Sequence, residues 1–166
     1  MNTEIEIFAN IVGFPNYQVS NHGNVKNVKT GRILKPTINC GYLKVALRND
    51  GDISNKQLHR LVAITFLENP DNKPCVDHIN RNPLNNHISN LRWATPTENQ
   101  QNASIRIDNA SGTTGVFFNK SNQKWQAQIT ADGRKIHLGS FEDKNDAIFA
   151  RTEAEIRFFG EFRSTA

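Results

Sequence analysis

The sequence predicts an α+β chain assembled from small modules rather than built around one large core. Residues 5–50 contain short apolar segments separated by turn signals, which is typical of antiparallel strands. Residues 76–102 have the order strand, loop, strand, helix. Residues 113–162 alternate apolar and polar side chains and then change to a helical period, which predicts a three-stranded antiparallel sheet packed on one helix.

The distribution of charge indicates which parts of the chain meet an anionic partner. The 166 residues carry a net charge of +4, and the isoelectric point is near 9.2. Residues 1–50 contribute +3, residues 51–110 contribute 0 and residues 111–166 contribute +1. Positive charge therefore lies towards the two flanks, which favours flanks that bind phosphates.

Cysteine usage and hydropathy indicate a soluble, cytoplasmic protein. Cys40 and Cys75 do not form a C-x-x-C pair, so we expect reduced thiols, no disulfide framework and no structural zinc. No apolar run approaches 18 residues, and the N-terminus lacks the apolar segment of a signal peptide. We therefore expect no membrane partner.

The N-terminal segment, residues 1–56, is predicted to form short strands near residues 17–20, 24–28, 33–35 and 43–47. In the last of these, apolar residues alternate with polar ones, so one face is apolar and the other is partly basic. The basic residues of this segment are candidate phosphate contacts: Lys26, Lys29, Arg32, Lys35, Lys44 and Arg48. A solvated strand face explains any single one of them equally well.

The central segment, residues 57–103, begins with a predicted helix over residues 57–67. His59 on this helix either faces a site formed by the following residues or packs behind it, and a structural or secondary role is favoured. A strand then ends in Asp77 and His78, and an asparagine-rich loop follows. Thr95-Pro96-Thr97-Glu98 indicates a helix start, with a hydroxyl cap, a proline and a carboxylate in the first turn.

The joint spacing of Asp77, His78, Asn90 and Asn99 resembles the HNH nuclease motif in its ββα-metal fold. More narrowly, HRLVAITF…VDHIN…NN…NLRWAT…EN resembles the HNH homing endonucleases of phages and mobile introns. The run NYQVSNHGNVKN resembles the nuclease-associated modular domain that often precedes such nucleases. The resemblance implies that the N-terminal segment is a small antiparallel DNA-binding module.

The resemblance also implies roles for the four motif residues. Asp77 and Asn99 would hold one divalent cation, Mg²⁺ or Mn²⁺, because such hard ions prefer oxygen ligands. His78 would be the general base, since its ordinary pKa of about 6.5 leaves it mostly neutral near pH 7. Asn90 would hold the imidazole or its loop by hydrogen bonds.

The C-terminal segment, residues 113–166, follows a predicted linker over residues 104–112 that contains Arg106, a further candidate phosphate contact. Strands are predicted at 115–118, 124–130 and 134–141, and a helix over 143–159 with one stripe of Ala147, Ala150, Ala154 and Phe158. The pattern GVFFNKSNQKWQAQIT…GRKIHLGSF…DAIFARTEAE resembles the Apetala-type, ethylene-responsive DNA-binding domain.

That domain lays its sheet in the major groove, so the resemblance assigns the two faces of the predicted sheet. Val116, Phe118, Trp125, Ala127, Ile129, Ile136 and Leu138 would face the helix. The face toward DNA would carry Phe117, Asn119, Thr130 and the candidate contacts Lys124, Gln126, Gln128, Lys135 and His137. Gln126 and Gln128 have side chains suited to adenine edges.

These patterns together predict a site-preferring endonuclease that hydrolyses double-stranded DNA with one metal ion and nicks one strand as a monomer. No small-molecule substrate or second protein is required. The alternative is a non-cutting, sequence-specific DNA-binding regulator with a decayed nuclease core, and the intact Asp77, His78, Asn90 and Asn99 argue against it. A non-specific degradative nuclease would have no use for two flanking recognition modules.

Overall fold

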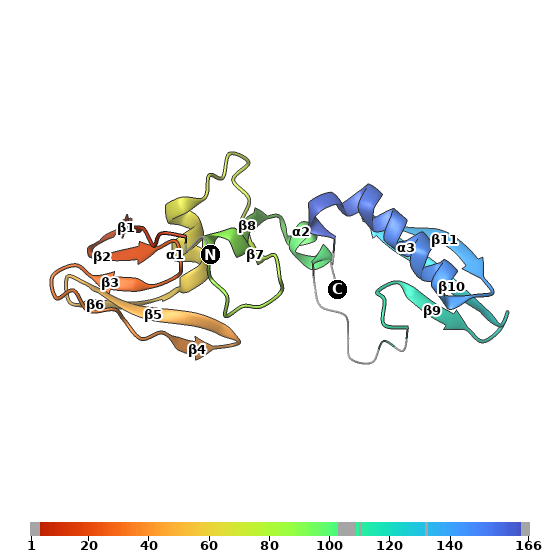
Figure 1. The fold of residues 1–166 in the computed structure, drawn as a ribbon, viewed down its shortest axis with the longest axis horizontal. Coiled ribbons are helices and arrows are strands. Elements are labelled where there is room, and N and C mark those ends of the chain that lie inside the picture. Colours follow the sequence, from red (N-terminus) through yellow and green to blue (C-terminus); the bar gives the residue numbers. More distant parts are fainter. Residues whose placement is uncertain (1–3, 103–108, 110, 132, 164–166) are drawn as a thin grey trace. The chain divides into compact units, whose positions relative to one another are not determined.

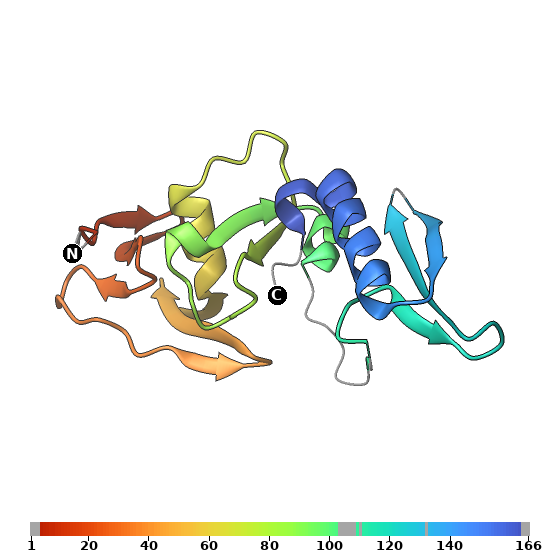
Figure 2. The same cartoon turned by 45° about the vertical axis from the view of Figure 1, so that its right-hand side comes forward.

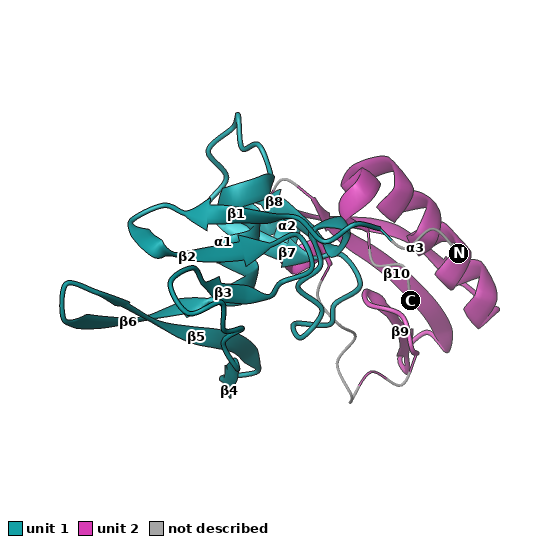
Figure 3. Ribbon diagram, turned by 60° about the vertical axis from the view of Figure 1, so that its left-hand side comes forward, with its two compact units in different colours: residues 1–99 teal, residues 100–166 magenta. Residues whose placement is uncertain are grey.

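The computed structural model describes residues 4–102, 109, 111–131 and 133–163. The chain divides into two compact units, residues 1–99 and 100–166, shown in different colours in Figure 3. The predicted fold class, mixed α and β with several small antiparallel sheets, is confirmed. No helix within the described ranges is both long enough and apolar enough to span a bilayer.

The first unit contains two three-stranded antiparallel sheets (Figure 1). The first sheet has the order β1-β2-β3 and the second the order β4-β5-β6. Their strands are β1 (Phe8–Ile11), β2 (Phe14–Ser20), β3 (Val25–Asn27), β4 (Thr37–Asn39), β5 (Tyr42–Asn49) and β6 (Asp52–Gln57). The predicted segments near 17–20, 24–28 and 43–47 correspond to β2, β3 and β5.

Three strands of these sheets were not predicted, and the segment near 33–35 forms only an isolated bridge between Lys26 and Ile33. The clearest omission is β6, which pairs with β5 along its whole length. Its sequence, DISNKQ, is mostly polar, so it has no apolar alternation. The turn before it does carry a signal: Asp50 and Gly51 both have positive φ, 49° and 93°, as Asp-Gly does in tight hairpins.

The remaining elements of the first unit begin with helix α1 (Leu58–Phe66), which lies within the predicted range 57–67. A two-stranded antiparallel sheet follows, formed by β7 (Cys75–His78) and β8 (Leu91–Ala94), with the short 3₁₀ helix η1 (Ile88–Asn90) before β8. Helix α2 (Pro96–Gln101) begins two residues after β8. Strand, loop, strand and helix therefore occur in the predicted order.

One continuous apolar core holds the first unit together. It joins Val19 and Leu47 from the two N-terminal sheets to Val62 on α1 and to Val76 and Leu91 on the β7–β8 sheet. Val19, Leu47 and Val62 are completely buried. The core thus continues across residue 56. The predicted boundaries at residues 56 and 103 stay predictions.

The second unit is an antiparallel sheet of order β11-β10-β9 with helix α3 against one face (Figure 2). Its elements are β9 (Val116–Asn119), β10 (Lys124–Ala131), β11 (Arg134–Phe141), α3 (Lys144–Phe159) and the 3₁₀ turn η2 (Gly160–Phe162). All four main elements agree with the prediction to within one residue at each end. Ala127 and Ile129 are buried beneath α3, as the alternation requires.

Two predicted inward positions differ from the structure. Phe158 is 38% exposed, whereas Phe159 is buried, because the last turn of α3 turns Phe159 toward Ile129 and leaves Phe158 under the guanidinium of Arg157. Phe118 is 41% exposed on strand β9, at the edge of the sheet, although its ring packs edge-on against Trp125.

A buried arginine on α3 donates a hydrogen bond to the backbone of β10, the central strand of this sheet. Arg151 on α3 is 5% exposed, and its Nη1 donates to the carbonyl of Gln128 at 2.6 Å. That carbonyl lies where β10 and β11 shift register, between Ala127 and Gln128. Gly115 has φ of +78°, and a Cβ there would lie 2.3 Å from the Gln128 oxygen and 2.9 Å from Arg151 Nη1. Only glycine fits between these groups.

We predict that Gly115→Ala destabilises the second unit by about 1–3 kcal/mol, because the new methyl group must displace Arg151 or the β10 backbone. Gly133→Ala is the matched control, since Gly133 also has positive φ, +71°, but no atom within 4 Å of an added Cβ. Hydrogen exchange of the β10 amides measures the effect. Equal losses of protection in the two variants would contradict the close-approach argument.

Candidate active site

The pairing of β7 with β8 positions the residues of the candidate site. In this ladder Asp77 lies opposite Arg92, and His78 lies opposite Leu91. Asp77 and His78 are both buried, at 5% and 6% exposure. A carboxylate and an imidazole at adjacent positions of one buried strand end need polar partners, since an unsatisfied buried polar group is costly.

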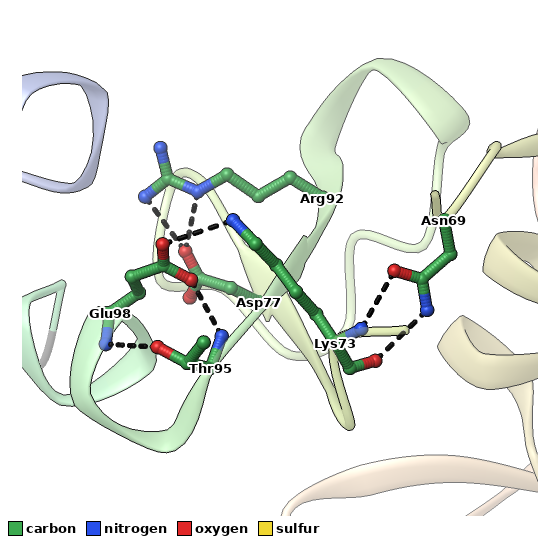
Figure 4. A network of polar contacts seen from close by, with 6 residues as sticks. All are labelled: Asn69, Lys73, Asp77, Arg92, Thr95 and Glu98. Carbon is green, nitrogen blue, oxygen red and sulfur yellow. Dashed lines mark hydrogen bonds and ion pairs between the residues drawn. The ribbon is translucent and has the colours of Figure 1, made fainter. Parts of the chain in front are cut away.

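Asp77 finds its partner directly across the ladder. Arg92 Nε and Nη2 both lie 2.8 Å from Asp77 Oδ2, and both side chains are largely buried (Figure 4). Sequence reasoning did not identify Arg92 as a site residue. Its pairing with Asp77 depends on the register of β7 and β8, in which the two opposite charges face each other, and the sequence alone does not give that register.

A second network fixes the start of α2. Thr95 N–H donates to Glu98 Oε2 at 2.6 Å, and Glu98 N–H donates to Thr95 Oγ1 at 3.2 Å, which is a reciprocal capping box. Lys73 Nζ lies 3.0 Å from Glu98 Oε1 (Figure 4). Burial alone would raise the pKa of Glu98, but the Thr95 bonds and the Lys73 ammonium outweigh it and lower the pKa. The predicted helix start is confirmed, and it sets the position of Asn99, which is exposed on α2.

His78 is held as a neutral imidazole. Burial lowers its pKa, while a hydrogen bond to Asn86 and the charge of Asp77 act in the opposite direction. The hydrogen bond joins His78 Nε2 to Asn86 Oδ1 at 3.1 Å. Asn86 is 4% exposed, and sequence reasoning treated it only as part of the asparagine-rich loop.

Two further rings lie beside His78. The ring of His59 is 5.0 Å from that of His78, centroid to centroid, and Tyr42 is 5.1 Å from His59. His59 is buried, and no described group lies within hydrogen-bonding distance of its Nδ1. Burial, aided by His78 and Arg60, lowers the pKa of His59 to about 4. His59 therefore lies against the candidate base, and Tyr42 was not identified from the sequence.

Asn90 stabilises the loop between His78 and β8 by hydrogen bonds. Its Oδ1 accepts from the backbone N–H of Asn80 at 3.0 Å, and its Nδ2 donates to the carbonyl of Asn85 at 2.8 Å. These bonds join the two ends of the loop. Of the two functions considered for Asn90, holding the imidazole or holding its loop, these contacts serve the second, and Asn86 contacts the imidazole.

The donor set at this site suits a hard divalent cation. Asp77 and Asn99 are the predicted ligands, and their side chains carry the oxygen atoms that such an ion prefers. Nowhere in the described ranges do three His, Cys, Asp or Glu side chains cluster into a closed cage. A cation at Asp77 would share its carboxylate with Arg92.

The candidate DNA contacts of the first unit differ in their surroundings. Lys26 Nζ lies over the Phe8 ring, 4.2 Å from its centroid, and Lys44 Nζ donates to Asn39 at 2.7 Å. The remaining four are exposed: Lys29, Arg32, Lys35 and Arg48. None of the six is buried, so each remains a candidate contact.

In the second unit, Lys124 forms an ion pair with Glu142 at 2.8 Å, and Gln126 lies 3.4 Å from Ser140 Oγ. Lys135 and His137 are exposed, and Gln128 is half-buried. Arg106 lies outside the described residues.

Comparisons with known proteins identify both halves of the first unit. Residues 6–48 match the NUMOD4 motif, and residues 56–101 match the HNH endonuclease family. DNA endonuclease I-HmuI of Bacillus phage SP01 is 42% identical over 118 residues, covering 70% of this chain and 68% of the relative. A solved structure described as DNA binding and cleavage by the HNH homing endonuclease I-HmuI matches with a TM-score of 0.57 and 34% identity, covering 79% of this chain and 76% of that one.

Longer relatives also match. An uncharacterized HNH endonuclease of Acanthamoeba polyphaga mimivirus, L247, is 48% identical over 102 residues, which cover 60% of this chain but 25% of the relative. The chain thus spans about a quarter of the length of this relative and about two thirds of I-HmuI.

We predict that the first unit loses stability as pH falls from 7 to 5, because unfolded His59 binds a proton near pH 6.5 and folded His59 does so only near 4. The free energy of unfolding should fall by roughly 1–2 kcal/mol over this window from His59 alone. Urea unfolding followed by Trp93 fluorescence in a Trp125→Phe background measures it. Both His59→Phe and His59→Gln should flatten the pH dependence, and an unchanged slope in both would contradict the assignment.

Proposed function

The chain belongs to the family of HNH homing endonucleases, and from this premise we propose that it hydrolyses phosphodiester bonds of double-stranded DNA at preferred sites. The observation that carries the proposal is a buried, neutral His78 next to the buried Asp77 at the end of strand β7. A base must be neutral to accept a proton, and a carboxylate beside it supplies an oxygen ligand for a cation.

In this proposal Asp77 and Asn99 hold one divalent cation, Mg²⁺ or Mn²⁺. When bound, the cation supplies positive charge for the developing charge at phosphorus and for the leaving 3′-oxygen. Arg92 neutralises Asp77 in the absence of the ion, and its guanidinium has the planar donor geometry that phosphate oxygens accept. With a cation bound, Arg92 and the cation would share the Asp77 carboxylate, and the guanidinium would add positive charge for the substrate phosphate.

His78 accepts the proton of the attacking water. Its lowered pKa favours the neutral ring at pH 7, which is the form that acts as base. Asn90 keeps the loop after His78 closed through Asn80 and Asn85. His59, with a pKa near 4, stays uncharged beside His78 and so adds no positive charge that would oppose protonation of the base.

The N-terminal sheets and the second unit position the DNA. The exposed basic residues of the first unit bind phosphates, and the face of the β9–β11 sheet opposite α3 lies on the duplex as an Apetala-type sheet would. One HNH motif per chain is sufficient to cut one strand, so the monomer nicks.

We predict metal-dependent nicking of supercoiled plasmid DNA that falls about 10²–10⁴-fold in His78→Ala, because the base is lost. Asp77→Asn should abolish metal-dependent nicking, and Asp71→Asn, which removes an exposed loop carboxylate, is its control. Open-circle product is expected. Linear product at limiting enzyme would refute the monomeric nickase, and salt-sensitive binding with no cutting of any plasmid would favour the non-cutting regulator.

We predict that Lys135→Ala weakens the salt dependence of DNA binding. The slope of the logarithm of the association constant against the logarithm of salt concentration should become about 1 less negative, because one phosphate contact is lost. Lys144→Ala removes the same charge from α3, on the other face of the sheet, and should leave the slope unchanged. Fluorescence anisotropy with a labelled duplex at several salt concentrations measures both slopes. Equal slopes in the two variants would place the DNA elsewhere.

A further inference from the structure

We infer that Asn86 is a positioning residue that fixes the tautomer of His78, and that the Ser20–Asn24 turn of the N-terminal sheet holds Asn86 in place. The inference rests on the proposed function, since it names a residue that acts through the general base. It also assigns the N-terminal sheet a role at the active site in addition to DNA binding.

The orientation of the Asn86 amide determines the tautomer. Asn86 Nδ2 donates to the carbonyl of Leu84 at 3.2 Å, so the amide nitrogen is committed to the loop backbone. The amide oxygen is thereby turned to His78 Nε2, 3.1 Å away. An amide oxygen can only accept a hydrogen bond, so Nε2 must carry the proton. In the neutral ring the lone pair then lies on Nδ1, which becomes the basic nitrogen.

The turn before β3 packs closely against Asn86 at Gly23. Gly23 has φ of +85°, and a Cβ at this position would lie 3.1 Å from Asn86 Cβ and 3.2 Å from its carbonyl oxygen. The turn itself is closed by Ser20, whose carbonyl accepts from Gly23 N–H at 3.0 Å and whose Oγ accepts from Asn24 N–H at 2.9 Å. Ser20 is completely buried, so the turn is anchored in the core of the unit.

Two more contacts join the turn to the same loop. Ile88 N–H donates to the carbonyl of Asn21 at 2.8 Å. The ring of His22 lies 4.8 Å from that of His87, centroid to centroid. Asn21 is 6% exposed, and its own Oδ1 accepts from Ile7 N–H at 2.8 Å. The loop segment after Asn86 is therefore held against the Ser20–Asn24 turn of the N-terminal sheet. Asn90 holds the rest of the loop through its hydrogen bonds to Asn80 and Asn85.

The geometry has a direct chemical consequence. If the amide rotated or moved away, Nε2 and Nδ1 would compete for the proton, and only part of the His78 population would present a lone pair at the reactive position. The loss would appear in the chemical step rather than in DNA affinity, because Asn86 is buried and is not available to the duplex.

The first test is a spectroscopic measurement of the His78 tautomer. Two-bond ¹⁵N–¹H correlation spectra of the full-length protein at pH 8, without metal or DNA, should show His78 protonated at Nε2. Asn86→Leu should populate the Nδ1-protonated form, and Asn86→Asp, which keeps an acceptor oxygen, should retain the wild-type tautomer. Predominant Nδ1 protonation in the wild type, or an unchanged spectrum in Asn86→Leu, would overturn the inference.

Kinetics on a plasmid substrate provide the second readout. Asn86→Leu should lower kcat for nicking roughly 10–100-fold, the usual effect of losing a partner that orients a functional histidine. The dissociation constant for the same DNA should change less than threefold. A loss in affinity with unchanged kcat would make Asn86 a binding residue and overturn the inference.

The contribution of the turn is tested with a pair of glycine variants. Gly23→Ala should lower kcat, since its methyl group displaces residue 86. Gly13→Ala is the matched control, because Gly13 also has positive φ, +78°, in the same sheet but nothing within 4 Å of an added Cβ. In an Asn86→Ala background, Gly23→Ala should cost no further kcat. A full additional loss there would show that the turn does not act through Asn86.

The spectra also separate this inference from the proposed function. If the wild type nicks no DNA yet shows the expected tautomer, which changes in Asn86→Leu, the nuclease proposal fails and the role of Asn86 in positioning His78 stands. If nicking occurs but the tautomer is insensitive to Asn86, the nuclease proposal stands and this inference fails.

Discussion

The pairing of two four-residue strands, β7 and β8, is the constraint on which the site depends. Their register places Asp77 opposite Arg92, and it places His78 at the point where β7 ends and the loop begins. A shift of β7 by one residue would turn Asp77 and His78 each to the opposite face of the sheet. The ladder is too short to hold itself, so it depends on the core beneath it, where Val76 and Leu91 pack with α1 and the N-terminal sheets.

Local chemistry made much of the fold predictable from the sequence. The C-terminal strands alternate, the helix that follows has a clear apolar stripe, and the capping box at Thr95 and Glu98 marks the start of α2. Strand β6 was missed because a polar edge strand is specified by its partner and its turn, not by its own pattern. Phe158 was placed on the buried stripe by extending the helical period to the last turn of α3, where Phe159 packs against Ile129 instead.

At the site, sequence reasoning identified residue types, while the partners came only from the structure. The spacing of Asp77, His78 and Asn90 indicated a nuclease, but nothing in it separated Asn86 from the other asparagines of the loop. Tyr42 lies more than thirty positions from His78 in the chain, and its ring, 6.1 Å away, could be placed only by the packing of β5. Contacts of this kind depend on tertiary structure, which periodicity does not encode.

The core that runs across residue 56 limits how this chain can be recombined. Val19 and Leu47 share one interior with Val62 and Leu91, so a chimera joined near residue 56 would pair two surfaces that never evolved together. Such a hybrid would have to repack α1 and the β7–β8 sheet against a foreign sheet. A splice placed beyond residue 99 would cut between the two compact units instead. Exchange of parts is therefore structurally simplest at the C-terminal side.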